Sequence, residues 1–208
     1  DANTMGLWHF NEGSGLQVFD VSGNNNHGLI NGTSWSANMP FTIGQVIFGC
    51  MDSTASNYDP LANIDDGSCT YQMTYVPDDN FEQALINLGY DNILDDSVMT
   101  ANINIVTYLD VHNQGIADLT GIEDFISLTD LQCHTNQLTS LDVSNNTNLT
   151  SLGCGYNSQL TSLNVGSNTA LTHLYCHDSQ ITSLDLSTNT ALTYLACYSN
   201  QLASLDVS

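Results

Sequence analysis

The chain has 208 residues, of which 22 are Asp or Glu and none is Lys or Arg, so its formal net charge at pH 7 is −22. A soluble chain of this length normally carries on the order of 25 Lys plus Arg, so ordinary salt bridges are excluded. Because phosphates and anionic lipids attract cationic side chains, we expect neither a nucleic-acid partner nor membrane insertion. The apolar fraction of 41% is sufficient for a globular core.

Residues 1–48 are predicted to form antiparallel β-strands. The β-prone runs GLWHF, LQVFDVS and HGLINGTSW alternate with turn segments NEGSG and SGNNN. The chain begins at Asp1 without a basic, apolar leader, and we expect a processed or excised chain.

The strand around Trp8 and the SGNNNHG turn resemble the first strands of a laminin-G-like, concanavalin-type jelly roll. A jelly roll needs about eight strands in two sheets, and this segment supplies fewer. The resemblance therefore implies an incomplete jelly-roll-like unit whose edges would be completed by other strands.

Residues 49–71 form a short Asp- and Asn-rich module bounded by Cys50 and Cys69, which we expect to be bridged by a disulfide worth about 3 kcal/mol. Its GC...DGSC pattern resembles a small module of bacterial surface proteins, and the resemblance implies calcium. Asn and Asp also make turns without metal, so that alternative stays open. The oxygen ligands expected for calcium are Asp52, Asn57, Asp59, Asn63, Asp65 and Asp66.

Residues 72–105 are predicted to form a helical cap. In PDDNFEQALINLGYDN, Asp79 is the expected N-cap, Glu82 stands three residues later as in a capping box, and Gly89 is the expected stop.

Residues 106–208 carry an internal repeat. Units begin at Leu128, Leu149, Leu171 and Leu192, with spacings of 21, 22 and 21 residues, and an atypical unit from Val106 keeps the same apolar register. The pattern L-x-x-L-x-C-x-x-N-x-L is that of leucine-rich repeats. The predicted fold is mainly β: a leucine-rich-repeat solenoid after a short helical cap. The sequence stops at LDVS inside a repeat, where we expect a partner or a continuation.

The segment from about residue 75 to 208 resembles the internalin-like repeat regions of secreted bacterial surface proteins. YVPDDNFEQAL and LTGIEDF before the regular repeats carry the resemblance, together with the repeats themselves. It implies an exported, extracellular setting, at the cell surface or in an extracellular fibre. It names no ligand.

The third apolar position of each regular repeat is a cysteine, in the order Cys133, Cys154, Cys176 and Cys197. Because side chains alternate along a strand, these thiols are expected to point inward as small core residues. The Asn three positions later is expected to bond turn backbone, except in the third regular repeat, where Ser179 replaces it.

The outward strand positions are expected to form a concave binding face. Its Tyr and His side chains suit recognition of a sugar or a protein, while Gly153 and Gly155 leave a dip in it. The expected residues are Tyr108, Asp110, His112, Asp130, Gln132, His134, His173, Tyr175, His177, Tyr194 and Tyr198.

Short motifs also make five positions glycosylation candidates. The N-linked sequons are at Asn31, Asn145 and Asn148, and Asp-Ser-apolar or Asp-Ser-Thr motifs are at Ser53 and Ser97.

The chain is predicted not to be an enzyme, because His, Ser and Cys are scattered without a nucleophile–base pattern, and no organic cofactor is expected. The first functional hypothesis is a fibre or surface-assembly subunit, built by strand complementation and solenoid-end contacts with copies of itself or with other surface-protein domains. The alternative is an adhesin fragment that binds a glycan or protein on the concave face.

Overall fold

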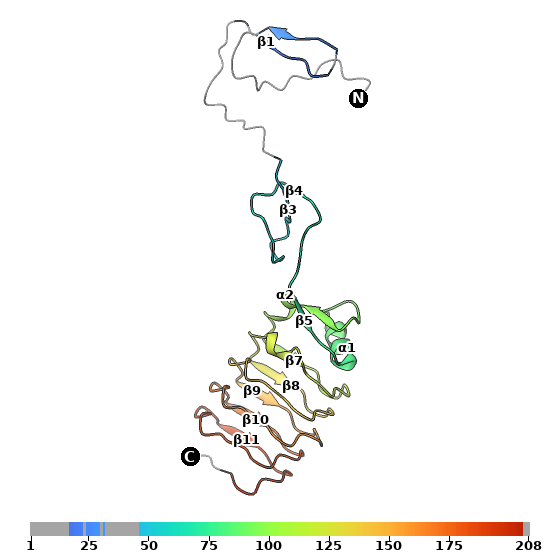
Figure 1. Cartoon of the computed structure of the whole chain (residues 1–208). Helices are drawn as coiled ribbons and strands as arrows, with labels where there is room; N and C mark the ends of the chain where they lie inside the picture. The colour runs from blue at the N-terminus through green and yellow to red at the C-terminus, as the bar shows by residue number, and fades with distance from the viewer. Residues whose placement is uncertain (1–16, 23, 30, 32–45, 206–208) are drawn as a thin grey trace. The chain divides into compact units, whose positions relative to one another are not determined.

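The computed structural model describes residues 17–22, 24–29, 31 and 46–205. The chain divides into two compact units, residues 1–47 and 48–208, coloured along the chain in Figure 1. In the first unit, β1 (Gln17–Val18) pairs antiparallel with β2 (Gly28–Leu29). The rest of the predicted incomplete jelly roll lies mostly outside the described residues.

The second unit begins with a small loop module. The strands β3 (Phe48–Gly49) and β4 (Ile64–Asp65) pair in parallel, and a disulfide joins Cys50 to Cys69 across a Cα–Cα distance of 4.7 Å. Next, β5 (Met73–Tyr75) pairs antiparallel with β6 (Ser97–Met99), which leads directly into the short helix α2 (Thr100–Ile103).

Helix α1 (Asp79–Asn87) lies where the sequence predicts a helix, but its N-cap is Asp78, so the expectation of Asp79 is wrong. One carboxylate oxygen of Asp78 accepts from the backbone N–H groups of Asn80 and Phe81, each at 3.0 Å. The other oxygen accepts from the N–H groups of Ala117 and Asp118, at 2.8 and 3.0 Å. The carboxylate that begins the helix therefore also fixes the helix to the first repeat.

Glu82 does not reach back to the N-cap as a capping box would. It is completely buried and accepts backbone N–H bonds from Asp95, Asp96 and Ser97, at 2.9, 3.1 and 3.0 Å. In a chain without Lys or Arg, these N–H groups take the place of a cationic partner. The capping-box expectation is wrong because this loop competes for the same carboxylate.

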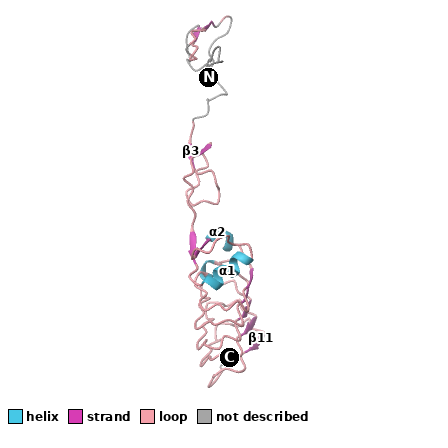
Figure 2. Ribbon diagram, turned by 90° about the vertical axis from the view of Figure 1, so that its right-hand side faces the viewer, coloured by secondary structure: helices cyan, strands magenta, loops and turns pink. Residues whose placement is uncertain are grey.

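The solenoid consists of five coils, residues 106–127, 128–148, 149–170, 171–191 and 192–205, each of which contributes one three-residue strand to a parallel sheet. The strands are β7 (Tyr108–Asp110), β8 (Asp130–Gln132), β9 (Ser151–Gly153), β10 (His173–Tyr175) and β11 (Tyr194–Ala196). A short 3₁₀ helix, η1 (Ile122–Asp124), lies in the first coil. Loops make up most of each coil (Figure 2).

The core of the solenoid is a stack of leucines with the cysteines beside them. The register aligns Leu109, Leu131, Leu152, Leu174 and Leu195 at the centre of successive strands. The same core contains Phe81 and Leu85 of α1, and the Phe81 ring lies 6.4 Å from that of Phe125. Burial of these apolar side chains is the main term that stabilises the coils.

Two rows of buried asparagines bond each coil to the one before it. In the row that the sequence indicates, Asn157 donates to the carbonyls of Cys133 and Cys154, at 3.2 and 2.8 Å, and accepts from the N–H of Leu138 at 3.1 Å. The sequence analysis missed a second row, which consists of Asn146, Asn168 and Asn189. The side-chain amide of each donates to two backbone carbonyls of the preceding coil.

A row of threonines adds a third set of bonds between coils. Each Thr hydroxyl donates to the backbone carbonyl of the equivalent Thr in the preceding coil, at 2.8 to 3.1 Å. The donors are Thr129, Thr150, Thr172 and Thr193. Neutral side chains thus satisfy buried or strand-end carbonyls without using a charge.

The interruption of the asparagine row at Ser179 has a geometric cause. The coil of residues 149–170 is one residue longer than its neighbours, and its extended turn lets Leu160 donate its N–H to the carbonyl of Asn157 at 2.9 Å. The N–H that an asparagine at position 179 would accept from is therefore already bonded. The smaller Ser179 bonds weakly to the His177 carbonyl at 3.5 Å.

Replacing Asn157 by Ala should lower the free energy of unfolding by about 3 kcal/mol, because buried N–H and C=O groups in two coils would lose their partner. Ser179→Ala is the matched control and should cost less than about 1 kcal/mol. Urea unfolding followed by circular dichroism measures both. Equal losses for the two variants would contradict the assigned role of the asparagine row.

Candidate ligand-binding face

The outward side chains of the five strands form one continuous surface, which we call the strand face. The register places its residues in three rows across the coils. The first row is Tyr108, Asp130, Ser151, His173 and Tyr194; the second is Asp110, Gln132, Gly153, Tyr175 and Ala196; the third, which follows the strands, is His112, His134, Gly155, His177 and Tyr198. The structure thus brings together all the residues that the sequence assigns to a concave face.

Rings on neighbouring coils contact one another along the strand face. His112 and His134 stack with centroids 4.9 Å apart, and His177 and Tyr198 stack at 4.7 Å. The ring of Tyr175, in the second row, lies 5.0 Å from that of Tyr194, in the first row. Because a short strand fixes each Cβ, these rings form a rigid surface with polar tips.

A cavity of about 510 Å³ lies on the strand face over the two glycines of the third coil, and we call it the glycine hollow. The absence of two side chains creates it, since neighbouring coils carry Gln, Tyr or His at these positions. Its lining residues are Asp130, Gln132, His134, Ser151, Gly153, Gly155, Tyr156, Tyr175 and His177.

Residues of the flanking coils pack against Gly153 and Gly155. A Cβ atom on Gly153 would meet the carboxamide of Gln132, and one on Gly155 would lie 2.9 Å from the His177 carbonyl oxygen. The Gln132 carboxamide is held by a 2.7 Å bond from its nitrogen to Asp130. The floor of the hollow therefore includes two polar groups, the Gln132 carboxamide and the His177 carbonyl.

Sequence analysis missed Tyr156 as a wall of the hollow, because it lies three residues beyond strand β9, outside the alternating positions that were assigned to the face. Its backbone is left-handed, with φ 56°, and so is the equivalent residue of every other coil, among them Thr135 and Asp178. This turn places the Tyr156 ring 5.0 Å from that of His177, edge to face.

The histidines of the strand face are coupled to carboxylates and to one another. His112 bonds Asp110 at 2.6 Å, and His177 bonds Asp178 at 3.0 Å. Partial burial favours a higher pKa for Asp110, but the hydrogen bonds from His112 outweigh it and hold the pKa below its ordinary value. Burial first, and the neighbouring His112 second, lower the pKa of His134, although Asp110 opposes them.

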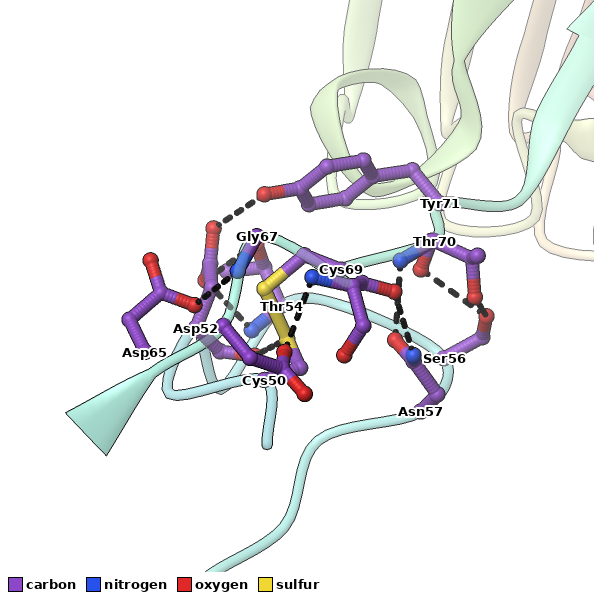
Figure 3. The surroundings of a disulfide bond; sticks show 12 residues. Cys50, Asp52, Thr54, Ser56, Asn57, Asp65, Gly67, Cys69, Thr70 and Tyr71 are labelled. Carbon is purple, nitrogen blue, oxygen red and sulfur yellow. Dashed lines mark hydrogen bonds between the residues drawn. A yellow bond between two sulfur atoms is a disulfide. The ribbon is translucent and has the colours of Figure 1, made fainter. Parts of the chain in front are cut away.

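The residues expected to bind calcium are used in local turns (Figure 3). Asp52 accepts from Thr54 and from the Tyr71 hydroxyl, and Asn57 bonds the backbone of Ser68 and Thr70. The other carboxylates each accept a backbone N–H two residues ahead: Asp59, Asp65 and Asp66. In the described part of the chain, no group of three or more His, Cys, Asp or Glu is placed to hold a metal. Calcium binding, with Asn63 among its ligands, stays a prediction.

The glycosylation candidates differ in accessibility. Asn31, Asn145, Asn148 and Ser53 are exposed, whereas Ser97 is half-buried. The amide nitrogen of Asn148 donates to the Ile126 carbonyl at 2.9 Å, and the Ser97 hydroxyl donates to Asp95 at 2.9 Å. Their modification stays a prediction.

The cysteine side chains point into the solenoid, away from the strand face. Cys133, Cys154 and Cys176 are buried free thiols, and Cys197 is half-buried. Burial raises the pKa of Cys133 and Cys176 to about 12 and also raises that of Cys154. Such thiols stay protonated and act as small apolar side chains.

Comparison with known proteins identifies the type of repeat. The chain is 43% identical over 73 residues to internalin J of Listeria monocytogenes serotype 4b (strain F2365), which covers 35% of this chain and 8% of that protein. The internalin J of serovar 1/2a (strain ATCC BAA-679 / EGD-e) matches with the same identity and coverage. No family model matches the chain.

Two solved structures share the fold. The functional domain of internalin J from Listeria monocytogenes, described as including a cysteine ladder, has 42% sequence identity and a TM-score of 0.60, and the match covers 66% of this chain and 31% of that one. An internalin, InlF, from strain 4b F2365 has 23% identity and a TM-score of 0.53, with coverage of 63% and 46%.

The chain therefore has an internalin-like leucine-rich-repeat fold, and it spans 8% of the curated relatives that it matches. The internalins it resembles are surface or secreted proteins rather than enzymes. No helix in the described part of the chain is long and apolar enough to cross a membrane.

Removing His112 should raise the pKa of His134 toward its ordinary value of about 6.5, because His112→Ala removes both covering surface and a neighbouring positive charge. Two-dimensional NMR of the imidazole C–H groups across pH measures this shift, and His27→Ala, in the other unit, is the control. An unchanged pKa would contradict the coupling of the two rings.

The same lowered pKa has a consequence for stability. The folded state binds fewer protons than the unfolded chain between the lowered pKa of His134 and 6.5, so stability falls as pH drops through that window. The fall in the free energy of unfolding across this window should be smaller in His112→Ala than in the wild type, because the pKa of His134 is then closer to its unfolded value.

Proposed function

We propose that this chain is the recognition part of an exported surface protein and that it binds a protein ligand on the strand face. The observation that carries the proposal is the strand face itself, where half-buried and exposed Tyr and His rings from every coil gather on and around the glycine hollow. Charged side chains are few there, and aromatic side chains are enriched, as in the centres of protein–protein interfaces.

The rigidity of the sheet supports binding by this face. Each ring is positioned by a strand whose leucine is buried in the core, and ring-to-ring contacts such as that of His177 with Tyr198 restrict the rotamers further. Little side-chain entropy is then lost on binding, which favours affinity. The internalin-like fold adds support, because it is the fold of surface proteins.

The triple variant Tyr175→Ala, His177→Ala, Tyr198→Ala should reduce binding to intact cells that bind the wild-type chain by about tenfold or more, since it removes a large part of the face. The absence of Lys leaves the N-terminal amine as the one primary amine of the chain under test, so a single fluorophore can be attached there without modifying any side chain of the strand face. Flow cytometry then measures bound chain.

The double variant Tyr58→Ala, Tyr75→Ala is the matched control, because both rings are exposed outside the solenoid sheet. Trypsin treatment of the cells should abolish binding if the ligand is a protein, and residual trypsin cannot cleave this chain, which has no Lys or Arg. Wild-type binding retained by the triple variant would contradict the proposal.

The fibre subunit remains the second candidate. Leu29, in the two-residue strand β2, and Val21, three residues after β1, are more than half exposed. Short strands with free edges accept strands from another chain. Sedimentation velocity distinguishes the two functions: a concentration-dependent series of large species supports the fibre, and a single monomeric species contradicts it.

A further inference from the structure

The glycine hollow is lined both by oxygen acceptors and by flat rings. The acceptors include Asp130 and the carboxamide of Gln132, and the rings are those of His134, Tyr156, Tyr175 and His177. Its volume of about 510 Å³ falls in the range of pockets that enclose a ligand group.

Asp130 differs from the other carboxylates of this surface. Asp110 is paired with His112, and Asp178 with His177. Within the described residues, Asp130 has a hydrogen bond to the neutral amide of Gln132 and no ion pair. Its negative charge therefore remains uncompensated at the edge of a rigid cavity.

The charge of the whole chain favours a cation at this point. With 22 carboxylates and no Lys or Arg, the protein steers positively charged partners toward itself and repels anionic ones. A neutral sugar would gain nothing from this field, although it could stack on the same rings.

We propose that the glycine hollow receives an arginine side chain from a basic segment of the protein partner. This inference rests on the proposed function and names the chemistry of its ligand. The planar guanidinium stacks on an aromatic ring of the hollow while its paired N–H groups donate to the Asp130 carboxylate. Arginine fits better than lysine, because an ammonium group is a point charge that cannot use a flat ring and two parallel acceptors together.

The glycines are what allow this occupant to enter. A side chain at position 153 would compete with the Gln132 carboxamide for the same space, and the guanidinium would lose the approach to Asp130. The third coil thus departs from the repeat pattern at the two positions where a ligand needs room.

The test is an NMR titration of the full ¹⁵N-labelled chain with N-acetyl-L-arginine amide. N-acetyl-L-citrulline amide has nearly the same shape without the charge, and N-acetyl-L-lysine amide has the charge without the plane. The arginine probe should shift the amide signals of Gly153, Gly155 and Tyr156 saturably, and the other two probes should bind at least about fivefold more weakly.

Asp130→Asn should weaken the arginine probe about fivefold, because it removes the charge and keeps an oxygen acceptor for Gln132. Asp185→Asn is the matched control. It removes the same charge, and the repeats already use Asn at the equivalent position, where Asn164 accepts from Gly166 as Asp185 accepts from Ser187. This control should bind the probe like the wild type.

Gly153→Ala gives a second, independent variant, since its methyl group meets the movable end of Gln132 and the backbone need not shift. It should also weaken binding of the arginine probe.

Equal shifts with the citrulline probe, or equal affinities of Asp130→Asn and Asp185→Asn for the arginine probe, would overturn the proposal. So would saturable shifts with methyl β-D-glucopyranoside alone, which would make the hollow a sugar site.

These outcomes are separable from the cell-binding result. If the triple alanine variant loses cell binding while the arginine probe leaves the hollow unaffected, the strand face keeps its function and the arginine inference falls. If the probe binds and the triple variant still binds cells, the hollow is a cation site and the proposed function falls.

Discussion

The absence of Lys and Arg is the constraint on which the rest of the structure depends. No carboxylate can be neutralised by a cationic side chain other than histidine, so the coils are joined by apolar packing and by neutral hydrogen bonds. Buried asparagines and the threonine row provide these bonds between each coil and its predecessor. Carboxylates that must be buried or half-buried use backbone N–H groups, as Glu82 does with the loop of residues 95–97.

This constraint also shapes the surface. Because the fold cannot pair its carboxylates with Lys or Arg, many of them are exposed, and the few histidines become the local counter-charges. On the strand face His112 is paired with Asp110, and His177 is paired with Asp178, which follows it directly in the chain. Asp130 has no such partner within the described residues, and it lines the glycine hollow.

The sequence predicts the repeating part of the structure well, because a 21-residue period fixes which side chains point inward. The aligned leucines, the inward cysteines and every predicted strand-face residue lie where the period places them. The sequence also indicates that the first asparagine row bonds turn backbone, as Asn157 does with the Cys154 carbonyl. The bonds of the asparagines and threonines to the preceding coil could not be assigned, since these partners lie one coil away. The second row, from Asn146 to Asn189, carries no local signal that separates it from an ordinary Asn-rich turn.

Details that turn on a single residue, such as which Asp caps helix α1, could not be predicted from the sequence either, because they depend on contacts with another coil. Asp78 and Asp79 are equally good caps in isolation, and only the contact of Asp78 with the first coil distinguishes them. Likewise, the sequence shows that the third coil is one residue longer. It does not show that the longer turn bonds the Leu160 N–H internally, which removes the donor that an asparagine at position 179 would need. The glycine hollow itself required the placement of Tyr156 beside His177.

The central claim is that neutral hydrogen bonds and apolar packing join the coils of the solenoid, whereas the net interaction among the chain's 22 carboxylates is repulsive. The most direct test is the free energy of unfolding in urea as a function of NaCl between low and physiological ionic strength, with a chelator present to remove divalent cations. The account predicts that stability rises with salt, because screening weakens the repulsion among carboxylates and there are no Lys or Arg ion pairs to lose. A fall in stability with added salt would show that attractive charge interactions hold the coils together, and it would contradict the account.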